Sequence, residues 1–351
     1  MQKAEIIRSF DPNGVGLRNG RFIGLPFDAD SAEVLLLPVP WDVTVSYRAG
    51  TSGGPENILE ASSQLDLFDP DIEDAWKLGI YFLPINPDWQ ERNAALRPLA
   101  AGYIDFVESG GSVEHNQDMR TILGEINLSC AALRQWVCDQ TLDTLRQGKL
   151  PGLVGGDHST PLGQIDALLE VHGAFGILHL DAHMDLREAY EGFTYSHASI
   201  FWNVLQRKGI TQLTQVGIRD YCEAEALFAK ELAGRVAVFF DQQLQEQAFQ
   251  GISWQEQCTR IIATLPEKVY ISFDIDALDP KLCPNTGTPV PGGLSLPQAL
   301  YLIKQLVSGG RTIIGFDLNE VGGLGCTWDG NVGARVLYKL CNWLGRSNGR
   351  I

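Results

Sequence analysis

An alternation that runs along most of the chain constrains the fold most strongly: a short apolar run, a polar or glycine-rich loop, then a helical stretch. Short runs rich in Val, Ile and Phe are typical of buried strands. The strands that we predict are residues 34–39, 153–154, 175–180, 213–218, 236–240, 269–273 and 312–318. The helices that we predict are residues 119–147, 162–171, 198–207, 224–232, 254–264, 297–307 and 332–344. Such alternation predicts an α/β fold whose parallel sheet is covered by helices on both faces.

We predict a single domain over residues 1–351, because no repeat, low-complexity segment or flexible linker divides the chain. An α/β fold of this length is common as one unit. Residues 1 to about 32 form an N-terminal extension before the first strand. Residues 85–116 interrupt the alternation, and we interpret them as an insertion with helical pieces.

The charge and cysteine patterns exclude several classes of protein. The net charge is −16, from 27 Lys and Arg against 43 Asp and Glu, so the chain would repel nucleic acid. Seven cysteines without a C-x-x-C pair indicate reduced thiols in a cytoplasmic protein. We find no signal peptide, and no apolar run approaches the ~20 residues that cross a bilayer, so we expect no membrane contact.

Histidine and acidic residues gather where predicted strands end, which is where open parallel sheets hold their ligands. His158 lies in the motif GGDHS at 155–159, after glycines that allow a sharp turn or a close backbone approach. The motif DAHMD at 181–185 follows the apolar run FGILHL. Its potential ligands alternate, and alternate residues of an extended segment share one face. Asp181, His183 and Asp185 can therefore converge on one point, although a solvated acidic loop is the plainer alternative.

Two further strand ends carry carboxylates. Asp274 and Asp276 follow the run VYISF and alternate in the same way. Two carboxylates that are forced together repel each other unless they share a proton or a metal. Glu320 follows the run TIIGF, where it could meet a planar guanidinium with paired hydrogen bonds or simply lie at the surface.

These segments together predict a metal centre with two histidine and four aspartate ligands. Imidazole and oxygen ligands without thiolates favour manganese or a similar divalent ion over structural zinc. Six ligands with four carboxylates suit two ions better than one, and two adjacent ions can activate water as a nucleophile. The predicted ligands are His158, Asp181, His183, Asp185, Asp274 and Asp276.

The motifs GGDHS, DAHMD, SFDIDALDP at 272–280 and GTPVPGG at 287–293 resemble the signature segments of the ureohydrolase family, which includes arginases, agmatinases, guanidinobutyrases and guanidinases. The resemblance implies a three-layer α/β/α fold and a binuclear manganese centre, with nickel as an alternative. It makes Asp181 and Asp274 bridging ligands. It also implies attack of an activated water on the guanidinium carbon, with release of urea.

The resemblance also implies roles for residues around the metals. His197 lies where the family places a histidine that moves protons to the leaving amine, and an imidazole suits that task. Glu320 resembles the residue that binds the guanidinium group. Asp185 joins these two as a candidate catalytic residue. Trp328 could narrow the pocket and favour a short substrate, although core packing is the alternative.

The segment at 40–50 is more similar to agmatinase-type enzymes than to arginases. We therefore expect an agmatinase-like hydrolase of a small guanidino compound, with guanidinase or guanidinobutyrase activity as alternatives. A single-zinc amide deacetylase and a non-catalytic metal-binding relative are hypotheses from other classes. The ligand set, which exceeds what one zinc needs, argues against the deacetylase. The resemblance also implies a homo-oligomer, either a trimer or a hexamer.

Overall fold

Eight parallel strands form one sheet in the order β2-β1-β3-β8-β7-β4-β5-β6. The computed structural model describes residues 2–351. The strands are β1 (Val34–Val39), β2 (Ile80–Phe82), β3 (Leu150–Gly155), β4 (Phe175–Leu180), β5 (Ile210–Ile218), β6 (Val236–Phe240), β7 (Lys268–Asp274) and β8 (Thr312–Asn319). The predicted parallel sheet is therefore confirmed.

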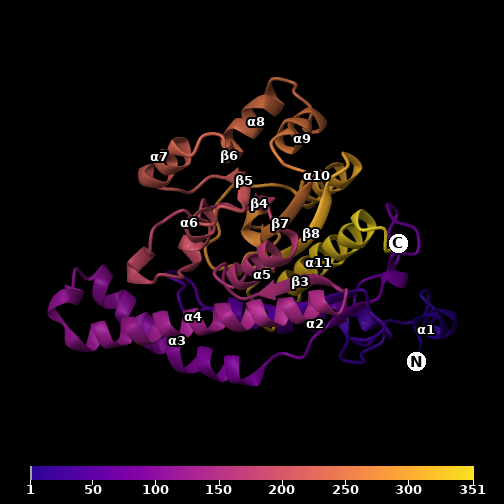
Figure 1. Ribbon diagram of the computed structural model, residues 1–351, viewed down its shortest axis with the longest axis horizontal. Helices are drawn as coiled ribbons and strands as arrows, with labels where there is room; N and C mark the ends of the chain where they lie inside the picture. Colours follow the sequence, from indigo (N-terminus) through magenta and orange to yellow (C-terminus); the bar gives the residue numbers. More distant parts are fainter. Residues whose placement is uncertain (1) are drawn as a thin grey trace.

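Helices enclose the sheet, and Figure 1 shows them around the central strands. The α-helices are α1 (Lys3–Ser9), α2 (Gly54–Ser62), α3 (Pro87–Glu108), α4 (Gln117–Arg146), α5 (Leu162–His172), α6 (Ile200–Leu205), α7 (Glu223–Glu231), α8 (Asp241–Phe249), α9 (Trp254–Ala263), α10 (Leu296–Ser308) and α11 (Thr327–Ser347). The 3₁₀ helices are η1 (Phe22–Gly24), η2 (Thr51–Gly53), η3 (Ala75–Leu78), η4 (Val113–His115), η5 (Tyr190–Gly192), η6 (His197–Ser199) and η7 (Ile275–Ala277).

Side-chain alternation divides the core between the two faces of the sheet. In β7, Val269 and Ile271 pack in a cluster with residues of α2, α9, α10 and α11. Tyr270, between them, packs in a second cluster with residues of α5, α6 and α7. Successive strand residues point to opposite faces, so each fully buried strand feeds both layers. This arrangement is the three-layer α/β/α architecture that we expected.

The region predicted as an insertion is mostly one helix. The 22-residue α3 takes up about two thirds of residues 85–116 and contains Pro98 in its interior. Asn86 accepts hydrogen bonds from the first turn of α3, and Asn116 does the same for α4, so each helix has an N-terminal cap. Helices α3 and α4 then pack as a hairpin along one edge of the molecule (Figure 1).

Several elements were missed by the sequence analysis. Strand β2 has only three residues and pairs with β1 at the edge of the sheet, so its apolar run is too short to stand out. Helices α1, α2 and α8 were also missed. Across residues 2–351, none of the helices combines the length and apolar character required to cross a bilayer. All seven cysteines are free thiols, as expected.

Candidate metal centre

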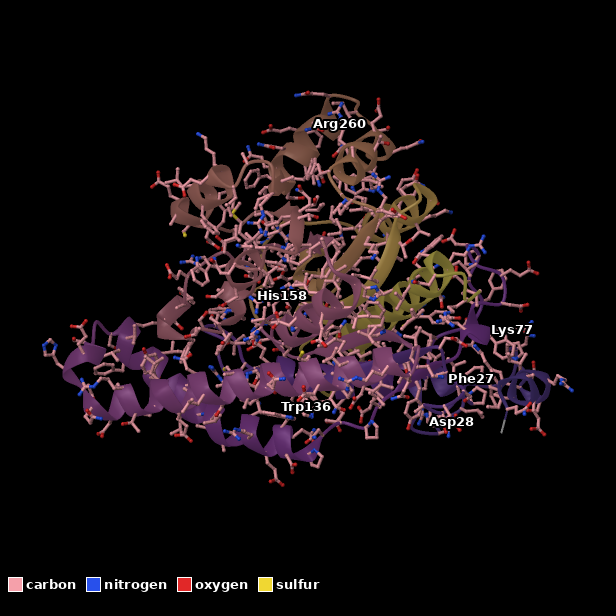
Figure 2. All side chains as sticks on the ribbon, in the orientation of Figure 1. Phe27, Asp28, Lys77, Trp136, His158 and Arg260 are labelled. Atoms are coloured by element: carbon pink, nitrogen blue, oxygen red, sulfur yellow. The ribbon has the colours of Figure 1, made fainter. Side chains whose placement is uncertain are left out.

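Four neighbouring strands bring the predicted site residues together. In the sheet, β3, β8, β7 and β4 lie side by side in that order. His158 follows β3, Glu320 follows β8, Asp274 ends β7 and Asp181 follows β4. Because all four strands are parallel, their carboxyl ends lie at the same edge of the sheet. In Figure 2, His158 lies near the centre of the view, above the helix that carries Trp136.

Close packing of the backbone at Gly155 and Gly156 positions His158 at this edge. A Cβ atom on Gly156 would overlap the carbonyl oxygen of Trp41, and one on Gly155 would overlap the side chain of Asn319. Only glycine fits at these two positions, as the sequence analysis anticipated for a close backbone approach. The backbone N–H of Asp157 then donates to the carbonyl oxygen of Trp41 at 2.7 Å, which fixes the turn.

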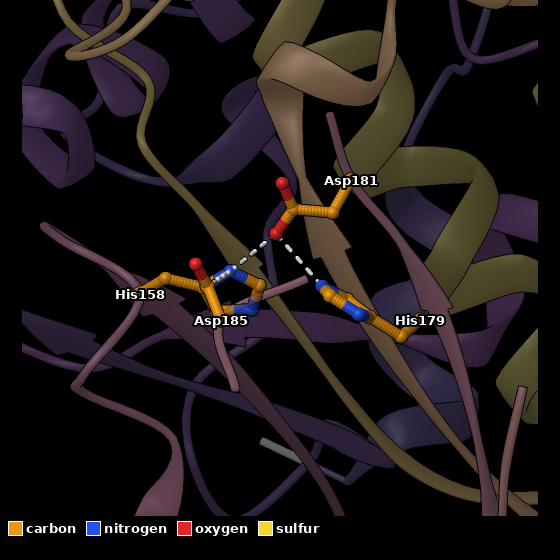
Figure 3. A group of neighbouring side chains, drawn as sticks. All are labelled: His158, His179, Asp181 and Asp185. Carbon is orange, nitrogen blue, oxygen red and sulfur yellow. Dashed lines mark hydrogen bonds and ion pairs between the residues drawn. The ribbon is translucent and has the colours of Figure 1, made fainter. Parts of the chain in front are cut away.

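The imidazole of His158 points one nitrogen at three carboxylates. Its Nδ1 lies 3.0 Å from Oδ2 of Asp181. The same atom lies 3.3 Å from Oδ2 of Asp185 and 3.3 Å from Oδ2 of Asp274. Figure 3 shows His158, Asp181 and Asp185 converging. This arrangement would place four donors around one ion.

A second group forms around His183. Its Nδ1 lies 3.1 Å from Oδ2 of Asp276 and 3.4 Å from Oδ1 of Asp181. Asp181, His183 and Asp276 are close enough to share an ion. Asp181 thus presents Oδ2 to His158 and Oδ1 to His183, so its carboxylate lies between the two groups. That position fits a carboxylate that bridges two ions.

Burial and crowding leave the protein groups in competition for protons. Burial and the neighbouring charge of Asp181 raise the pKa of Asp185 to about 7. Burial, followed by the charge of Asp276, raises the pKa of Asp274 well above its ordinary value. Burial alone would lower the pKa of His158, but contact with three carboxylates raises it well above the ordinary value. A divalent cation would relieve this conflict by stabilising every carboxylate in its ionised form.

Two buried oxygens reinforce the case for a cation. Oε2 of Glu320 has no hydrogen-bond partner among residues 2–351, and Oδ2 of Asp276 has no hydrogen bond of good geometry there, although Nδ1 of His183 lies 3.1 Å away. A buried carboxylate oxygen without a donor is costly, and a bound cation or cationic ligand would supply the missing interaction. The surrounding donors are imidazole nitrogens and carboxylate oxygens, a set that fits manganese and related divalent ions. The residues therefore fit a pair of divalent cations.

His179, in β4, is a buried site residue that the sequence analysis missed. It groups with His158, Asp181 and Asp185 closely enough to be a potential ligand. Its Nε2 lies 2.7 Å from Oδ2 of Asp181 (Figure 3). The available signal was alternation, because His179 precedes Asp181 by two residues and so shares its face.

The partners of His179 argue that it orients a ligand and does not bind metal itself. The side-chain amide nitrogen of Gln215 donates to the carbonyl oxygen of Met184 at 2.7 Å, which fixes the orientation of the amide. The same nitrogen lies 3.0 Å from Nδ1 of His179, so Nδ1 is the acceptor. We assign the proton to Nε2 from these partners. Nε2–H then donates to Asp181 and has no lone pair left for an ion.

A hydrogen-bond network that the sequence did not reveal holds Nε2 of His158, the ring nitrogen that faces away from the three carboxylates. Nε2 of His158 lies 2.9 Å from the hydroxyl of Ser272. That hydroxyl donates to Oδ1 of Asp317 at 3.0 Å, and the side chain of Asn319 donates to the same oxygen at 2.6 Å. Hydrogen-bonded partners of this kind fix the orientation of a metal-binding histidine. The chain thus holds its ligands through residues of β7 and β8.

Glu320 lies at the same edge in a left-handed backbone conformation, with φ of 62°. Its Oε1 accepts a hydrogen bond from the backbone N–H of His158 at 3.0 Å, while Oε2 is left free of protein donors. Asp185 also has a positive φ, of 53°. Non-glycine residues rarely adopt this conformation, and such strain concentrates at functional sites. One carboxylate oxygen of Glu320 is therefore fixed by the protein and the other is available to a ligand.

His197 lines the cleft above the metal-binding residues. Its backbone N–H donates to the hydroxyl of Thr44 at 3.2 Å, and Ser196 caps the short helix η6 that His197 begins. Burial, followed by the positive charge of His183, lowers the pKa of His197 to about 3. The ring is therefore neutral near pH 7.

The cleft has a mixed rim of charged and aromatic side chains. Arg187 lies with its guanidinium carbon 4.8 Å from the ring of Tyr190, and its Nε is 3.5 Å from Oε2 of Glu225. Asp220 lies on another side, with Oδ2 4.0 Å from Nε2 of His183. The lining residues are Ser46, His158, His183, Asp185, Arg187, Tyr190, His197, Ala198, Asp220, Tyr221, Glu225, Asp274, Thr288 and Glu320.

Trp328, which the sequence offered as a pocket residue or a core residue, is not among the side chains that line this cleft. Its side chain is about half exposed and lies in a separate surface groove with Arg18 and Arg335. The indole N–H donates to the carbonyl oxygen of Lys281 at 3.0 Å. In the sequence, Trp328 lies soon after the end of β8. It belongs to helix α11, which starts at Thr327, and its side chain lies in the separate groove.

Comparisons with known proteins identify the family of this chain. The sequence pattern of the Arginase family matches residues 32–324. The chain is 32% identical over 293 residues to the N(1)-aminopropylagmatine ureohydrolase of Thermus thermophilus, covering 83% of each chain. It is 28% identical to an agmatinase of Bacillus anthracis, covering 83% of this chain and 84% of that one.

Among solved structures, the fold is similar to that of the proclavaminate amidino hydrolase of Streptomyces clavuligerus. The TM-score is 0.69 at 23% identity, with 95% of this chain and 100% of that chain covered. The likeness supports the arginase-like α/β fold. With the family pattern spanning most of the chain and the two histidine and aspartate groups at the sheet edge, the protein belongs to the arginase family.

Proposed function

We propose that this protein is an agmatinase-like hydrolase that cleaves the guanidino group of a small guanidino compound and releases urea. The observation that carries the proposal is the position of Asp181, whose two oxygens face two separate histidine groups. A divalent ion in each group would supply an activated water as the nucleophile. The ligands that we propose are His158, Asp181, His183, Asp185, Asp274 and Asp276.

Manganese is our first choice of metal and nickel our second. The donor set supports a borderline divalent ion, since it combines imidazole nitrogen with several carboxylate oxygens.

Glu320 is the proposed guanidinium-binding residue. Its free Oε2 is buried at the edge of the sheet, beside the carboxylates that would hold the metals. A planar guanidinium donates several hydrogen bonds in one plane, so a fixed carboxylate would both bind and orient it. His197 is the proposed proton carrier to the leaving amine, because its imidazole lines the same cleft.

Agmatine is the first substrate to test, because relatives that match along most of their length are named as agmatinases or as an N(1)-aminopropylagmatine ureohydrolase. Asp220 and Glu225 at the cleft could attract a cationic tail, while Arg187 could bind an anionic one. Guanidinobutyrate and free guanidine therefore stay in the panel.

Other properties are proposed from the family resemblance and the sequence. We propose one domain over residues 1–351, with an extension at about 1–32 and an insertion at 85–116. We also propose a homo-oligomer, either a trimer or a hexamer, and a cytoplasmic location for a protein whose seven cysteines are free thiols.

The direct test measures urea release from agmatine, guanidinobutyrate, guanidinopropionate, arginine and free guanidine, with enzyme loaded with manganese or with nickel. We expect turnover of at least one compound other than arginine. Absence of urea from every compound, in protein shown to contain two metal ions per chain, would contradict the proposal.

A further inference from the structure

A strained turn contributes Tyr190 to the lining of the cleft. Ala189 has φ of 42°, Glu191 has φ of 56° and Gly192 has φ of 85°. Three left-handed residues within four positions are uncommon, and two of them are not glycine. Such a conformation persists only where the surrounding structure holds it in place. Contacts from another part of the chain must therefore hold this turn.

The α3–α4 hairpin supplies the contacts. The hydroxyl of Tyr103, on α3, donates to the carbonyl oxygen of Glu191 at 2.9 Å. The side chain of Asn127, on α4, donates to the carbonyl oxygen of Gly192 at 3.1 Å. It also accepts from the backbone N–H of Thr194 at 2.8 Å. Two side chains thus form three hydrogen bonds with the backbone of residues 191–194.

Aromatic packing strengthens this attachment. Phe193 is completely buried, and its ring centroid lies 5.2 Å from that of Tyr103. Further along the same segment, the guanidinium carbon of Arg134, on α4, lies 5.9 Å from the ring centroid of Tyr195. The segment is therefore fastened to the hairpin on both sides of Thr194.

The segment that contacts the hairpin, residues 191–195, lies between two residues of the cleft. Tyr190 and His197 both line the cleft, one on each side of the attachment points. The backbone N–H of Tyr190 donates to the hydroxyl of Ser199 at 3.1 Å, which ties the two ends of the segment together. A shift of the turn would therefore move both cleft residues.

The same hairpin also holds a neighbouring segment, residues 42–43. Asn93, on α3, forms two hydrogen bonds with Asp42, at 2.8 and 3.0 Å. Arg97 donates to the carbonyl oxygen of Val43 at 2.8 Å. The next residue, Thr44, accepts the backbone N–H of His197. His197 therefore lies between two segments that are both attached to the hairpin, one through α3 alone and the other through α3 and α4.

We propose that the α3–α4 hairpin is the positioning element of this active site, and that Tyr103 and Asn127 are positioning residues that set the places of His197 and Tyr190. The hairpin includes most of the predicted insertion at 85–116, which thereby gains a role. The proposal rests on the proposed function for its kinetic part, because it assigns His197 to the reaction.

The test uses Asn127→Ala and the milder Tyr103→Phe, which removes a single hydroxyl, in metal-loaded full-length protein. Loss of the Asn127 contacts should lower kcat about tenfold, since each lost hydrogen bond of this kind corresponds to a several-fold change, while KM changes less. Hydrogen exchange of the amides at 189–197 should become faster, with exchange in the strands unchanged.

The matched control is Gln135→Ala, also on α4, where the side chain is exposed and bonds only to Asp139. It should keep wild-type kinetics and exchange. Wild-type kcat and wild-type exchange at 189–197 in both hairpin variants would overturn the proposal. If the wild-type protein releases no urea, the proposed function fails, but the exchange measurement still decides whether the hairpin orders the segment.

Discussion

His179 donates from Nε2 to Oδ2 of Asp181 across 2.7 Å, while its other ring nitrogen accepts from the amide of Gln215. One neutral imidazole therefore connects a strand-β5 amide to the carboxylate that faces both metal-binding groups. Partners of this kind orient a ligand and tune its affinity for the metal.

Replacing Gln215 with Leu should weaken metal binding. Without the amide, Nδ1 of His179 loses its donor, and the proton is no longer confined to Nε2. We expect the metal dissociation constant to rise about tenfold or more. Isothermal titration with manganese measures this directly, without any assay of activity. Gln212→Leu, at the start of the same strand and away from the site, is the control; equal affinities in both variants would contradict the tautomer that we assign.

The protein should bind two divalent ions per chain. Chelation should abolish urea release, and manganese or nickel should restore it. Because binding stabilises only the folded state, an ion at 100 times its dissociation constant adds about 2.7 kcal/mol to the free energy of unfolding, and Tm should rise. Elemental analysis gives the stoichiometry. A value of one ion in fully active protein would favour the single-zinc alternative instead.

Glu320→Gln should abolish most activity while the metals stay bound. The substitution removes the negative charge from the free Oε2 but preserves an oxygen that can accept from the backbone of His158. Loss of a charge-assisted pair with a guanidinium should lower kcat/KM about 100-fold or more. Glu223→Gln, exposed at the start of α7, serves as the control. If the Glu320→Gln variant loses its metal ions together with its activity, Glu320 supports the metal centre and is not the residue that binds the guanidinium group.

The strained turn should make stability depend on pH. Burial, followed by the charge of Glu108, raises the pKa of Glu191 to about 7. A carboxyl whose folded-state pKa is raised favours folding while protonated, so its contribution is present below the unfolded value, near 4.5, and is lost as the pH rises through about 7.

Glu191→Gln should therefore raise Tm by about 1–2 °C relative to the wild type at pH 8 and have little effect at pH 5. Thermal unfolding followed by circular dichroism at both pH values provides the measurement. The exposed neighbour Glu188, changed to Gln, should show no such pH dependence. A gain of equal size at pH 5 would mean that the charge of Glu191 is not responsible.

Trp328→Ala should leave substrate selection unchanged. The indole lies in a groove apart from the cleft, so the ratio of kcat/KM between agmatine and free guanidine should stay within about twofold of the wild type. The same urea assay provides the value. A large shift toward longer substrates would restore the role that the sequence suggested for this residue.

Local patterns in the sequence predicted seven of the eight strands, most of the helices and six closely placed donor residues. Alternation along residues 181–185 predicted that Asp181, His183 and Asp185 would converge, although the backbone departs from the extended conformation at Asp185, where φ is 53°. The glycines before His158 were likewise predictable from the turn that they allow.

Tertiary structure decided what depends on contacts between distant segments. The sheet order puts β8 between β3 and β7, which brings Glu320 beside His158 across 162 positions of sequence. The pairing of β4 with β5 also gave His179 its amide partner, and the packing of helix α11 places Trp328 in a separate groove. These outcomes depend on how separate elements pack against one another, and no local pattern encodes which segments will become neighbours.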